Sequence, residues 1–280
     1  WYPVSYGDSI EKRGESNDYK CVKYTKDDKE KYGFRIPECV NVIGDECFQR
    51  CSSLSSISIP SSVSLIGEMC FSGCASLESI TIPSSVSVIG KGCFFRCYIL
   101  SSISIPSSVS LIDKMCFREC ASLESITIPS SVSVISYGWF FWCRGLSSIT
   151  IPSSVSVISE MCFFLCISLS SISIPSSVSV IGEYCFSRCS SLSSISIPSS
   201  VTEIGDYCFN ECSSLSSISI PSSVTKIGKM CFRDCKSLSS VTIPSRFRSR
   251  IGKLCLNRQQ NITITYTGPD EGVMSGCVIE

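Results

Sequence analysis

Hydrophobic and polar positions along this chain recur with a period of 23 residues. A proline marks each period, and ten of the prolines follow one another at this interval: Pro37, Pro60, Pro83, Pro106, Pro129, Pro152, Pro175, Pro198, Pro221 and Pro244. Counted from the proline as position 0, apolar residues recur at positions 3, 6, 11, 17, 20 and 22, with Phe at position 11 and Leu at position 17 in nine copies each. Such regularity predicts a solenoid, in which identical side chains of successive coils stack in columns.

The end of each period, as in "LSSISIP", alternates apolar and polar residues. Ile218 and Ile220 would face one way and Ser217 and Ser219 the other, which is the pattern of a short strand with one buried face. The proline then ends the strand, because it has no N–H to donate. The middle of the period, as in "IGDYCFNEC", spaces its apolar residues for one or two helical turns. The predicted fold class is therefore an α/β solenoid, with a parallel β-sheet on one face and short helices or 3₁₀ turns on the other.

The repeats also suggest how the chain is divided. Residues 36–243 hold nine full coils, residues 1–35 are polar and break the period, and residues 244–280 hold a degenerate last coil with a final strand in "NITITYTG". Terminal coils must cover an open core, so the two end segments are expected to be an N-terminal and a C-terminal cap.

The repeat "LxxIxIPxxVxxIGxxCFxxCxS" resembles the BspA-like leucine-rich repeat, and the match covers about residues 36–243. This family is common on the surfaces of some bacteria and in anaerobic protists. Its usual pattern has Ala before the Phe, where this chain has Cys, which points to a protist-like variant. The resemblance implies a surface or adhesion protein.

Composition narrows the classes of function. Lys plus Arg and Asp plus Glu are both 24, which offers no basic face for a nucleic-acid partner. The absence of histidine removes Ser-His-Asp, Cys-His and His-metal chemistry, and no phosphate-binding or dinucleotide-binding fingerprint is present. We therefore expect no catalytic residue, no cofactor and no metal. The sequence contains no run of 18 apolar residues, so we expect no membrane span within this chain.

Most of the 21 cysteines form a C-x₃-C pair at positions 10 and 14 of the repeat. They are interpreted as buried thiols that fill the core, with disulfides and a zinc site as the alternatives. Trp139 favours the first interpretation, because it replaces the position-10 cysteine in one coil. In the caps, Cys21 with Cys39 and Cys255 with Cys277 are candidate disulfides. Asn261 is a candidate N-glycosylation site if the chain is secreted.

Position 21 supplies a first candidate surface, a column of hydroxyl side chains on the outer face of the strands. It is interpreted as a ligand or glycan face, with a merely solvated sheet face as the alternative. Its members are Ser58, Thr81, Ser104, Thr127, Thr150, Ser173, Ser196, Ser219 and Thr242.

Positions 12 and 13 supply a second candidate surface. They are polar in most coils, but three coils carry apolar residues there: Phe95, Phe141, Trp142, Phe164 and Leu165. Arg118 and Glu119 interrupt this set. An aromatic patch on an outer face is typical of a protein contact, so it is predicted to be the main one, including contact with a second copy of the chain. Trp139 of the same region faces inward by register, and must either push the chain outward or turn over to the surface.

These features predict a non-enzymatic surface-type protein for adhesion or for protein or glycan binding, at the cell surface or outside the cell. One alternative is a structural subunit of a surface layer or filament, assembled through coil ends or through the aromatic patch. A second is an intracellular, cytoplasmic interaction scaffold, because free cysteines suit a reducing compartment.

Overall fold

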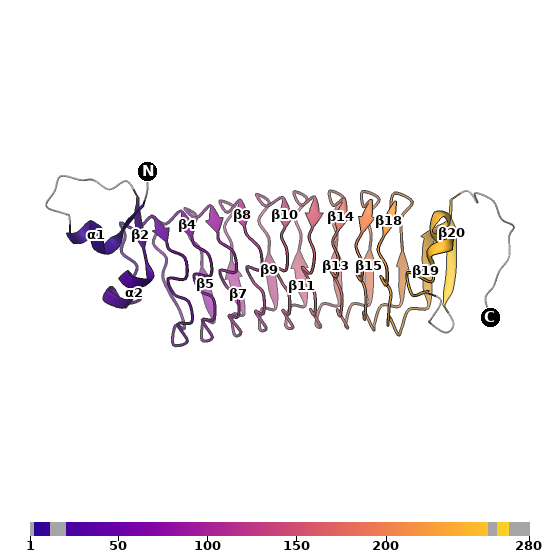
Figure 1. Ribbon diagram of the computed structural model, residues 1–280, viewed down its shortest axis with the longest axis horizontal. Helices are drawn as coiled ribbons and strands as arrows, with labels where there is room; N and C mark the ends of the chain where they lie inside the picture. The colour runs from indigo at the N-terminus through magenta and orange to yellow at the C-terminus, as the bar shows by residue number, and fades with distance from the viewer. Residues whose placement is uncertain (1–2, 12–20, 257–261, 269–280) are drawn as a thin grey trace.

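The computed structural model describes residues 3–11, 21–256 and 262–268 and shows one elongated, nearly straight stack of coils (Figure 1). All strand pairs are parallel, and from β3 onward every pair joins residues 23 apart in the sequence, as in Ile172 with Ile195. Each coil therefore lies in register on the one before. The predicted solenoid with parallel strands is confirmed.

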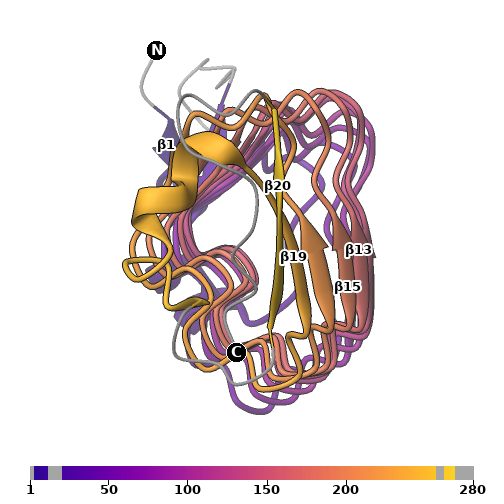
Figure 2. The ribbon, with the colours of Figure 1, turned by 90° about the vertical axis from the view of Figure 1, so that its right-hand side faces the viewer.

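Short strands of three residues, or of five in the last two coils, stack along one side of the solenoid (Figure 2). Their burial alternates outward, inward, outward, with the Ile or Val at position 20 on the inner face. They pair as β5–β7, β9–β11, β13–β15 and β17–β19–β20. The strands are β5 (Ser79–Thr81), β7 (Ser102–Ser104), β9 (Ser125–Thr127), β11 (Ser148–Thr150), β13 (Ser171–Ser173), β15 (Ser194–Ser196), β17 (Ser217–Ser219), β19 (Ser240–Pro244) and β20 (Thr263–Thr267).

A second, narrow set of strands lies at positions 5 and 6, where the sequence predicted none. It forms a six-stranded sheet, β1-β2-β3-β4-β6-β8, and a five-stranded sheet, β10-β12-β14-β16-β18. Its strands are β1 (Val4–Ser5), β2 (Val22–Tyr24), β3 (Val42–Ile43), β4 (Leu65–Ile66), β6 (Val88–Ile89), β8 (Leu111–Ile112), β10 (Val134–Ile135), β12 (Val157–Ile158), β14 (Val180–Ile181), β16 (Glu203–Ile204) and β18 (Lys226–Ile227).

The middle of each coil is a run of turns, in contrast to the helices or 3₁₀ turns that the spacing predicted. Positions 9 and 13 have positive φ in all nine coils, as at Tyr207 (φ 55°) and Glu211 (φ 58°), which breaks a right-handed helix. The N–H groups here also point to the next coil: Tyr184 N–H donates to the carbonyl of Asp206 at 2.8 Å, and Phe186 N–H to that of Cys208 at 2.9 Å. An α-helix needs those N–H groups for its own carbonyls four residues back.

Helical elements in the described part of the chain lie only outside the repeats. They are α1 (Tyr6–Glu11), α2 (Lys26–Tyr32) and the 3₁₀ helix η1 (Ser245–Arg250). At the N-terminal end, the buried carboxylate of Asp28 accepts from the backbone N–H of Gly7 and of Thr25, at 2.7 and 2.8 Å. Tyr24 stacks on Phe48 and so covers the first coil. The candidate disulfide between Cys21 and Cys39 does not form, since both thiols are free.

The core is built from columns of identical side chains. The position-11 phenylalanines, Phe48 to Phe232, stack with ring centroids 5.3–5.8 Å apart and planes within 15° of parallel. All of them are buried, together with the position-17 leucines and most cysteines. Because each coil offers its neighbours the same shapes, one small set of contacts is repeated along the whole solenoid.

Candidate binding surfaces

Many of the serines hold neighbouring coils together. Hydroxyls at positions 2, 4 and 18 donate to backbone carbonyls of the preceding coil: Ser62 Oγ to Val40 at 2.6 Å, Ser179 Oγ to Ser156 at 3.3 Å, and Ser216 Oγ to Ser193 at 3.4 Å. The same bonds recur in other coils, so these serines have a structural role.

Two hydroxyl columns on the three-residue strands are different, because none of their hydroxyls makes a hydrogen bond within the described part of the chain. One is the predicted column at position 21, which is exposed from Ser58 to Ser219 and half-buried at Thr242. The other column is at position 19, and the sequence-based interpretation did not recognise it. Position 19 is Ser in nine copies and lies on the same face of the strand as position 21, two residues later. Its members are all exposed: Ser56, Ser79, Ser102, Ser125, Ser148, Ser171, Ser194, Ser217 and Ser240.

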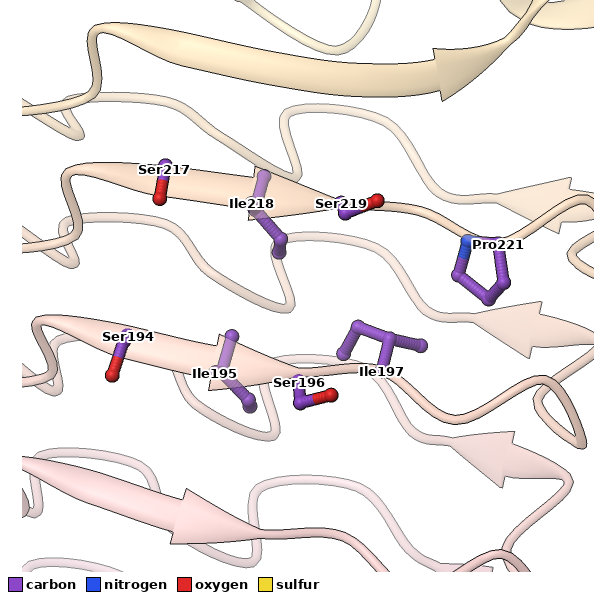
Figure 3. A pocket seen from close by; sticks show the side chains of 8 residues that line it. All are labelled: Ser194, Ile195, Ser196, Ile197, Ser217, Ile218, Ser219 and Pro221. Carbon is purple, nitrogen blue, oxygen red and sulfur yellow. The ribbon is translucent and has the colours of Figure 1, made fainter. Parts of the chain in front are cut away.

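The two columns form a flat array that we call the hydroxyl face. Thr263 and Thr265 of β20 pair with Ser240 and Thr242, are exposed, and extend both columns by one coil. From strand geometry the hydroxyls are about 4.8 Å apart between coils and about 6.6 Å apart along a strand. Figure 3 shows a shallow depression of this face, where the serine side chains lie outward from strands β15 and β17. Such a face suits an extended ligand more than a compact one.

The second candidate surface follows position 12 over the coils that begin at Pro83, Pro106, Pro129 and Pro152. The Arg118 guanidinium lies 5.7 Å from the ring centroid of Phe95 and 4.1 Å from that of Phe141, and Phe141 stacks on Phe164 at 4.9 Å. The expectation that Arg118 interrupts the aromatic residues is therefore wrong: its cation bridges them.

The contacts continue beyond the predicted residues. Phe164 meets Tyr184 edge-on at 6.4 Å, and Tyr184 stacks on Tyr207 at 4.7 Å. Both tyrosines come from position 9 of the next two coils, so a search of position 12 alone could not find them. We call the whole stripe the aromatic ridge; it comprises Phe95, Arg118, Phe141, Trp142, Phe164, Leu165, Tyr184 and Tyr207.

One buried carboxylate holds the arginines of this region. The side chain of Glu119 is only 7% exposed and accepts from Arg96 Nε at 3.0 Å and Arg118 Nε at 3.4 Å. On the ridge, Trp142 is exposed, while Phe95, Phe141, Phe164 and Leu165 are half-buried. The ridge therefore combines half-buried side chains, whose arginine is held in place by Glu119, with one exposed indole.

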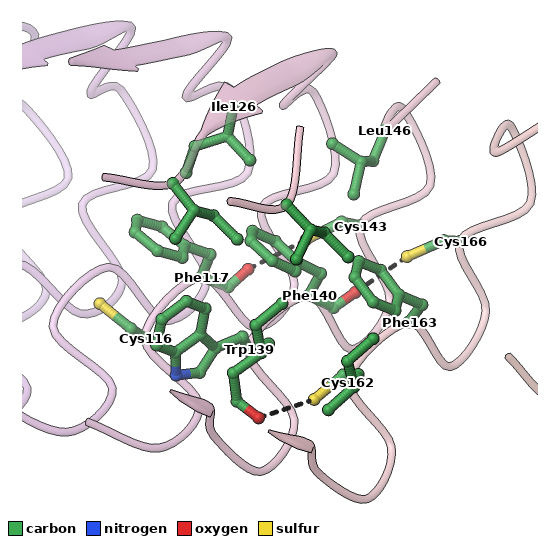
Figure 4. Packing of buried hydrophobic residues seen from close by; sticks show 14 of the residues in the cluster. Cys116, Phe117, Ile126, Trp139, Phe140, Cys143, Leu146, Cys162, Phe163 and Cys166 are labelled. Atoms are coloured by element: carbon green, nitrogen blue, oxygen red, sulfur yellow. Dashed lines mark hydrogen bonds between the residues drawn. The ribbon is translucent and has the colours of Figure 1, made fainter. Parts of the chain in front are cut away.

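Trp139 belongs to the same coil as Phe141 and Trp142 but lies in the core. It is fully buried and meets Phe117 and Phe140 edge-on, with ring centroids 6.4 and 6.0 Å away (Figure 4). The inward orientation is therefore the one that occurs. The indole Nε1 faces away from the phenylalanine column and has no hydrogen-bond partner.

The narrow sheet is interrupted where this indole lies, between β8 and β10. In the next coil, Ser159 N–H donates to the carbonyl of Ile135 at 2.9 Å, but the equivalent bond from Ser136 to Ile112 is missing. Leu111 and Val134 flank the gap and are 52% and 38% exposed. We call this gap the seam.

Position 7 contributes to the same opening. In regular coils it is glycine, and a Cβ on Gly182 would lie 2.5 Å from the backbone nitrogen of Glu160 in the preceding coil. Asp113, Ser136 and Ser159 carry a real Cβ at this position. Asp113 and Ser159 still donate to the carbonyls of Ile89 and Ile135 in the preceding coil, at 3.0 and 2.9 Å, and only Ser136 lacks this bond. The opening therefore lies between the coils at Pro106 and Pro129, and we call this place the open corner.

The cysteines are free thiols in the described part of the chain, and nearly all of those in the repeats are buried. Position-14 thiols donate to the carbonyl of the position-11 phenylalanine in the preceding coil, as from Cys166 to Phe140 at 3.1 Å. Burial raises the pKa of the Cys74 and Cys162 thiols to about 12. Such thiols are poor nucleophiles, because the thiolate is the reactive form.

Other candidate sites add little. Within the described residues, no three His, Cys, Asp or Glu side chains lie close enough to hold a metal ion, and no helix has the length and apolarity to cross a bilayer. Cys255 is a free buried thiol, whereas Cys277 and Asn261 lie outside the described residues.

Comparison with solved structures finds bacterial leucine-rich repeat proteins. One from Bacteroides ovatus is 24% identical, with a TM-score of 0.56 and coverage of 91% of this chain and 89% of its own. One from Eubacterium ventriosum is 23% identical (TM-score 0.53, 72% and 65% covered), and the pneumococcal vaccine antigen PcpA is 19% identical (TM-score 0.54, 86% and 65% covered). These likenesses concern the fold.

A search of curated proteins finds no match. The family model for the BspA type leucine rich repeat region matches six copies over residues 29–147 and 134–263. With the 23-residue register and the parallel strands, this match shows that the chain belongs to the BspA-type leucine-rich repeat family.

Proposed function

We propose that this protein is a non-enzymatic binding protein of the cell surface or extracellular space, and that it attaches to a protein partner through the aromatic ridge. The observation that carries the proposal is a stripe of aromatic and arginine side chains that pack on one another, next to which Trp142 exposes its indole, with the Arg144 guanidinium 4.9 Å from its ring centroid. Trp, Tyr and Arg are the residues that most often dominate binding energy at protein interfaces.

The ridge is also ordered before any partner arrives. Glu119 fixes Arg96 and Arg118, and Arg118 packs against Phe141. Side chains that are already held in place lose less conformational entropy on binding, which raises affinity for a given contact area. Membership of the BspA-type family supports the proposal of a surface protein, and adhesion is the function that combines a surface location with a protein contact.

The double variant Phe141→Ser with Trp142→Arg tests this function, since it installs the residue types of the regular coil at Pro175. The fold should persist, because position 12 is polar in most coils. Capture of surface proteins by the immobilised chain, and any self-association seen in its solution mass, should fall by about tenfold or more, in line with the loss of two anchors.

The control carries Arg233→Ser with Asp234→Arg, the same repeat positions in a regular coil outside the ridge. It should bind like the parent. If the ridge variant also binds and assembles like the parent, the aromatic ridge is only packing and the proposed function fails.

A second candidate function is binding of an extended surface glycan along the hydroxyl face. It is favoured by one observation: hydroxyls at positions 2, 4 and 18 are engaged by the fold, whereas those at positions 19 and 21 have no partner in the described chain and face solvent. Hydroxyls both donate and accept, so they match sugar hydroxyls. Shortening both columns by one coil, while the ridge from Phe95 to Phe164 is retained, tests this role.

A further inference from the structure

A surface cavity of about 530 Å³ lies at the open corner, beside the aromatic ridge. Its polar lining consists of Lys91, Lys114, Ser136, Tyr137, Ser159 and Glu160. These residues come from positions 7 and 8 of four successive coils, three of which have no glycine at position 7. The cavity therefore extends across the seam between the coils at Pro106 and Pro129.

The lining has more free donors than acceptors. Neither Lys91 nor Lys114 forms an ion pair within the described residues, where the lysine pairs are those of Lys23, Lys31, Lys226 and Lys229. Among the described residues, the amides of Ser136 and Tyr137 have no acceptor, whereas the amide of Gly182, which matches Ser136 in a regular coil, donates to the carbonyl of Ile158 at 2.8 Å. The seam has thus released an N–H group that the repeat normally uses.

Two lysines and two successive unpaired amides fit a carboxylate, which offers two oxygens and accepts charge-assisted hydrogen bonds. Glu160 is the one carboxylate of the lining, and it is paired with neither lysine. It lowers the net positive charge of the cavity and so sets a limit on the affinity for an anion.

The cavity and the ridge are in contact through one pair of side chains. Met115 lines the cavity, and its Sδ lies 3.8 Å from Nη1 of Arg118, the cation that bridges Phe95 and Phe141. The cavity is therefore within reach of a partner that covers the ridge.

We propose that the cavity receives the carboxylate of a glutamate or aspartate side chain from the protein that docks on the aromatic ridge. This inference rests on the proposed function and adds the chemistry of the partner: an acidic side chain next to apolar residues that pack on the ridge. Lys91 and Lys114 supply the charge, and the Ser136 and Tyr137 amides fix the position.

The test is a titration of the full, isotope-labelled chain with N-acetyl-glutamate amide, followed through the NMR shifts of the Ser136 and Tyr137 amides. Saturable shifts are expected. Binding should weaken by about tenfold or more in Lys91→Gln with Lys114→Gln, as two charge-assisted contacts are lost. It should tighten in Glu160→Gln. Lys229→Gln, which removes a position-8 lysine from a regular coil, should have no effect.

Three outcomes would overturn the proposal: shifts that do not saturate, equal shifts with N-acetyl-glutamine amide, or saturation by inorganic sulfate but not by the carboxylate. The variant Phe141→Ser with Trp142→Arg separates this result from the proposed function. It should leave the carboxylate titration unchanged. If partner capture survives in that variant, the proposed function is wrong. The carboxylate titration tests the cavity independently of that result.

Discussion

At the scale of single residues, repetition assigns each serine and cysteine column its own role. Hydroxyls at positions 2, 4 and 18 bond to the preceding coil, while those at positions 19 and 21 face solvent unpaired. Thiols at position 14 fill the core and donate to a phenylalanine carbonyl. A small, weakly polar side chain suits that place, because it adds packing and leaves no strong donor unsatisfied.

These thiols make the stability of the protein sensitive to alkali. Burial raises the pKa of Cys74 to about 12, and the pKa of Cys70 and Cys93 is also raised by burial. Unfolded thiols lose their proton near pH 8.5, so above this pH the unfolded chain is deprotonated while the native chain is not. The free energy of unfolding is therefore fully present below about pH 8.5 and should fall by about 1.4 kcal/mol per pH unit for each buried thiol as pH rises toward 12.

Urea unfolding under reducing conditions, at several values between pH 7.5 and 10, measures this slope. Cys70→Ala with Cys93→Ala is the matched variant, since Ala is the usual family residue at position 10. Its free energy of unfolding should fall less steeply with pH, by the amount that corresponds to about two protons. An identical slope in parent and variant would show that the native thiols ionise as freely as unfolded ones.

At the scale of elements, Trp139 and Ser136 act together to open the seam. The coil at Pro83 has nearly the same sequence as the coil at Pro129, but with Gly90 and Cys93 at the two equivalent positions. Its strand β6 pairs on both sides, with β4 and with β8. These are two of the seven differences between the coils. Because Asp113 and Ser159 keep their bonds to the preceding coil without glycine, we expect the serine and the indole together to cause the missing pair between β8 and β10.

The double variant Trp139→Cys with Ser136→Gly should restore that pair. The amide of residue 136 would then donate to the carbonyl of Ile112, and its hydrogen exchange should slow by about tenfold or more. Trp139→Cys alone leaves a cavity in the core and the Cβ at position 136, so it should destabilise the protein by about 3–5 kcal/mol without restoring protection. Fast exchange in the double variant would mean that the seam has another cause.

Prediction from the sequence succeeded for the elements that the repeat encodes locally. The strand at positions 19–21 followed from its alternation, and the phenylalanine column followed from its register. The helices that were predicted for the middle of the coil do not occur. They were predicted because the spacing Ile-x₃-Cys-Phe fits a helix as well as it fits a run of turns. The left-handed residues at positions 9 and 13, which rule the helix out, include Met, Glu and Arg and carry no recognisable turn signal.

The binding surfaces were only partly predictable, for the same reason. Phe95, Phe141, Trp142 and Phe164 stand out from polar positions, so composition located the ridge. That Arg118 bridges the rings, and that Tyr184 joins from position 9, depends on side chains of neighbouring coils meeting in space. The cavity could not be predicted at all, because it lies where one pair of coils loses its strand pairing, and a Cβ at position 7 does not mark that pair: Asp113 and Ser159 carry one and keep their bonds.

At the scale of the whole molecule, regular and irregular coils have different tasks. The departures from the repeat at positions 7, 10 and 12 gather in the coils between Pro83 and Pro152, which hold the seam, the open corner and most of the ridge. The coils from Pro175 onward keep the glycine, the cysteines and polar residues at position 12. A solenoid allows this division, because each coil contacts only its neighbours and stability is close to a sum over coils.

Deleting residues 175–197 tests this division and the glycan role together. The deletion removes one regular period and joins Ile174 to Pro198, so every core column stays in register, and the chain should fold with only a modest fall in melting temperature. The deletion removes Tyr184 of the ridge, but Tyr207 holds the same repeat position in the coil that then follows Phe164. The ridge from Phe95 to Phe164 is retained, and capture of the protein partner should persist. The hydroxyl face loses two hydroxyls. If an extended glycan binds there, its binding free energy should weaken by about 1–3 kcal/mol, which is the net value of two hydrogen bonds.

The control is a deletion of residues 186–197 only, which breaks the register and should prevent folding. Unchanged glycan affinity in the 23-residue deletion would reject the hydroxyl face as an extended site, and loss of partner capture would show that the ridge needs the coil at Pro175.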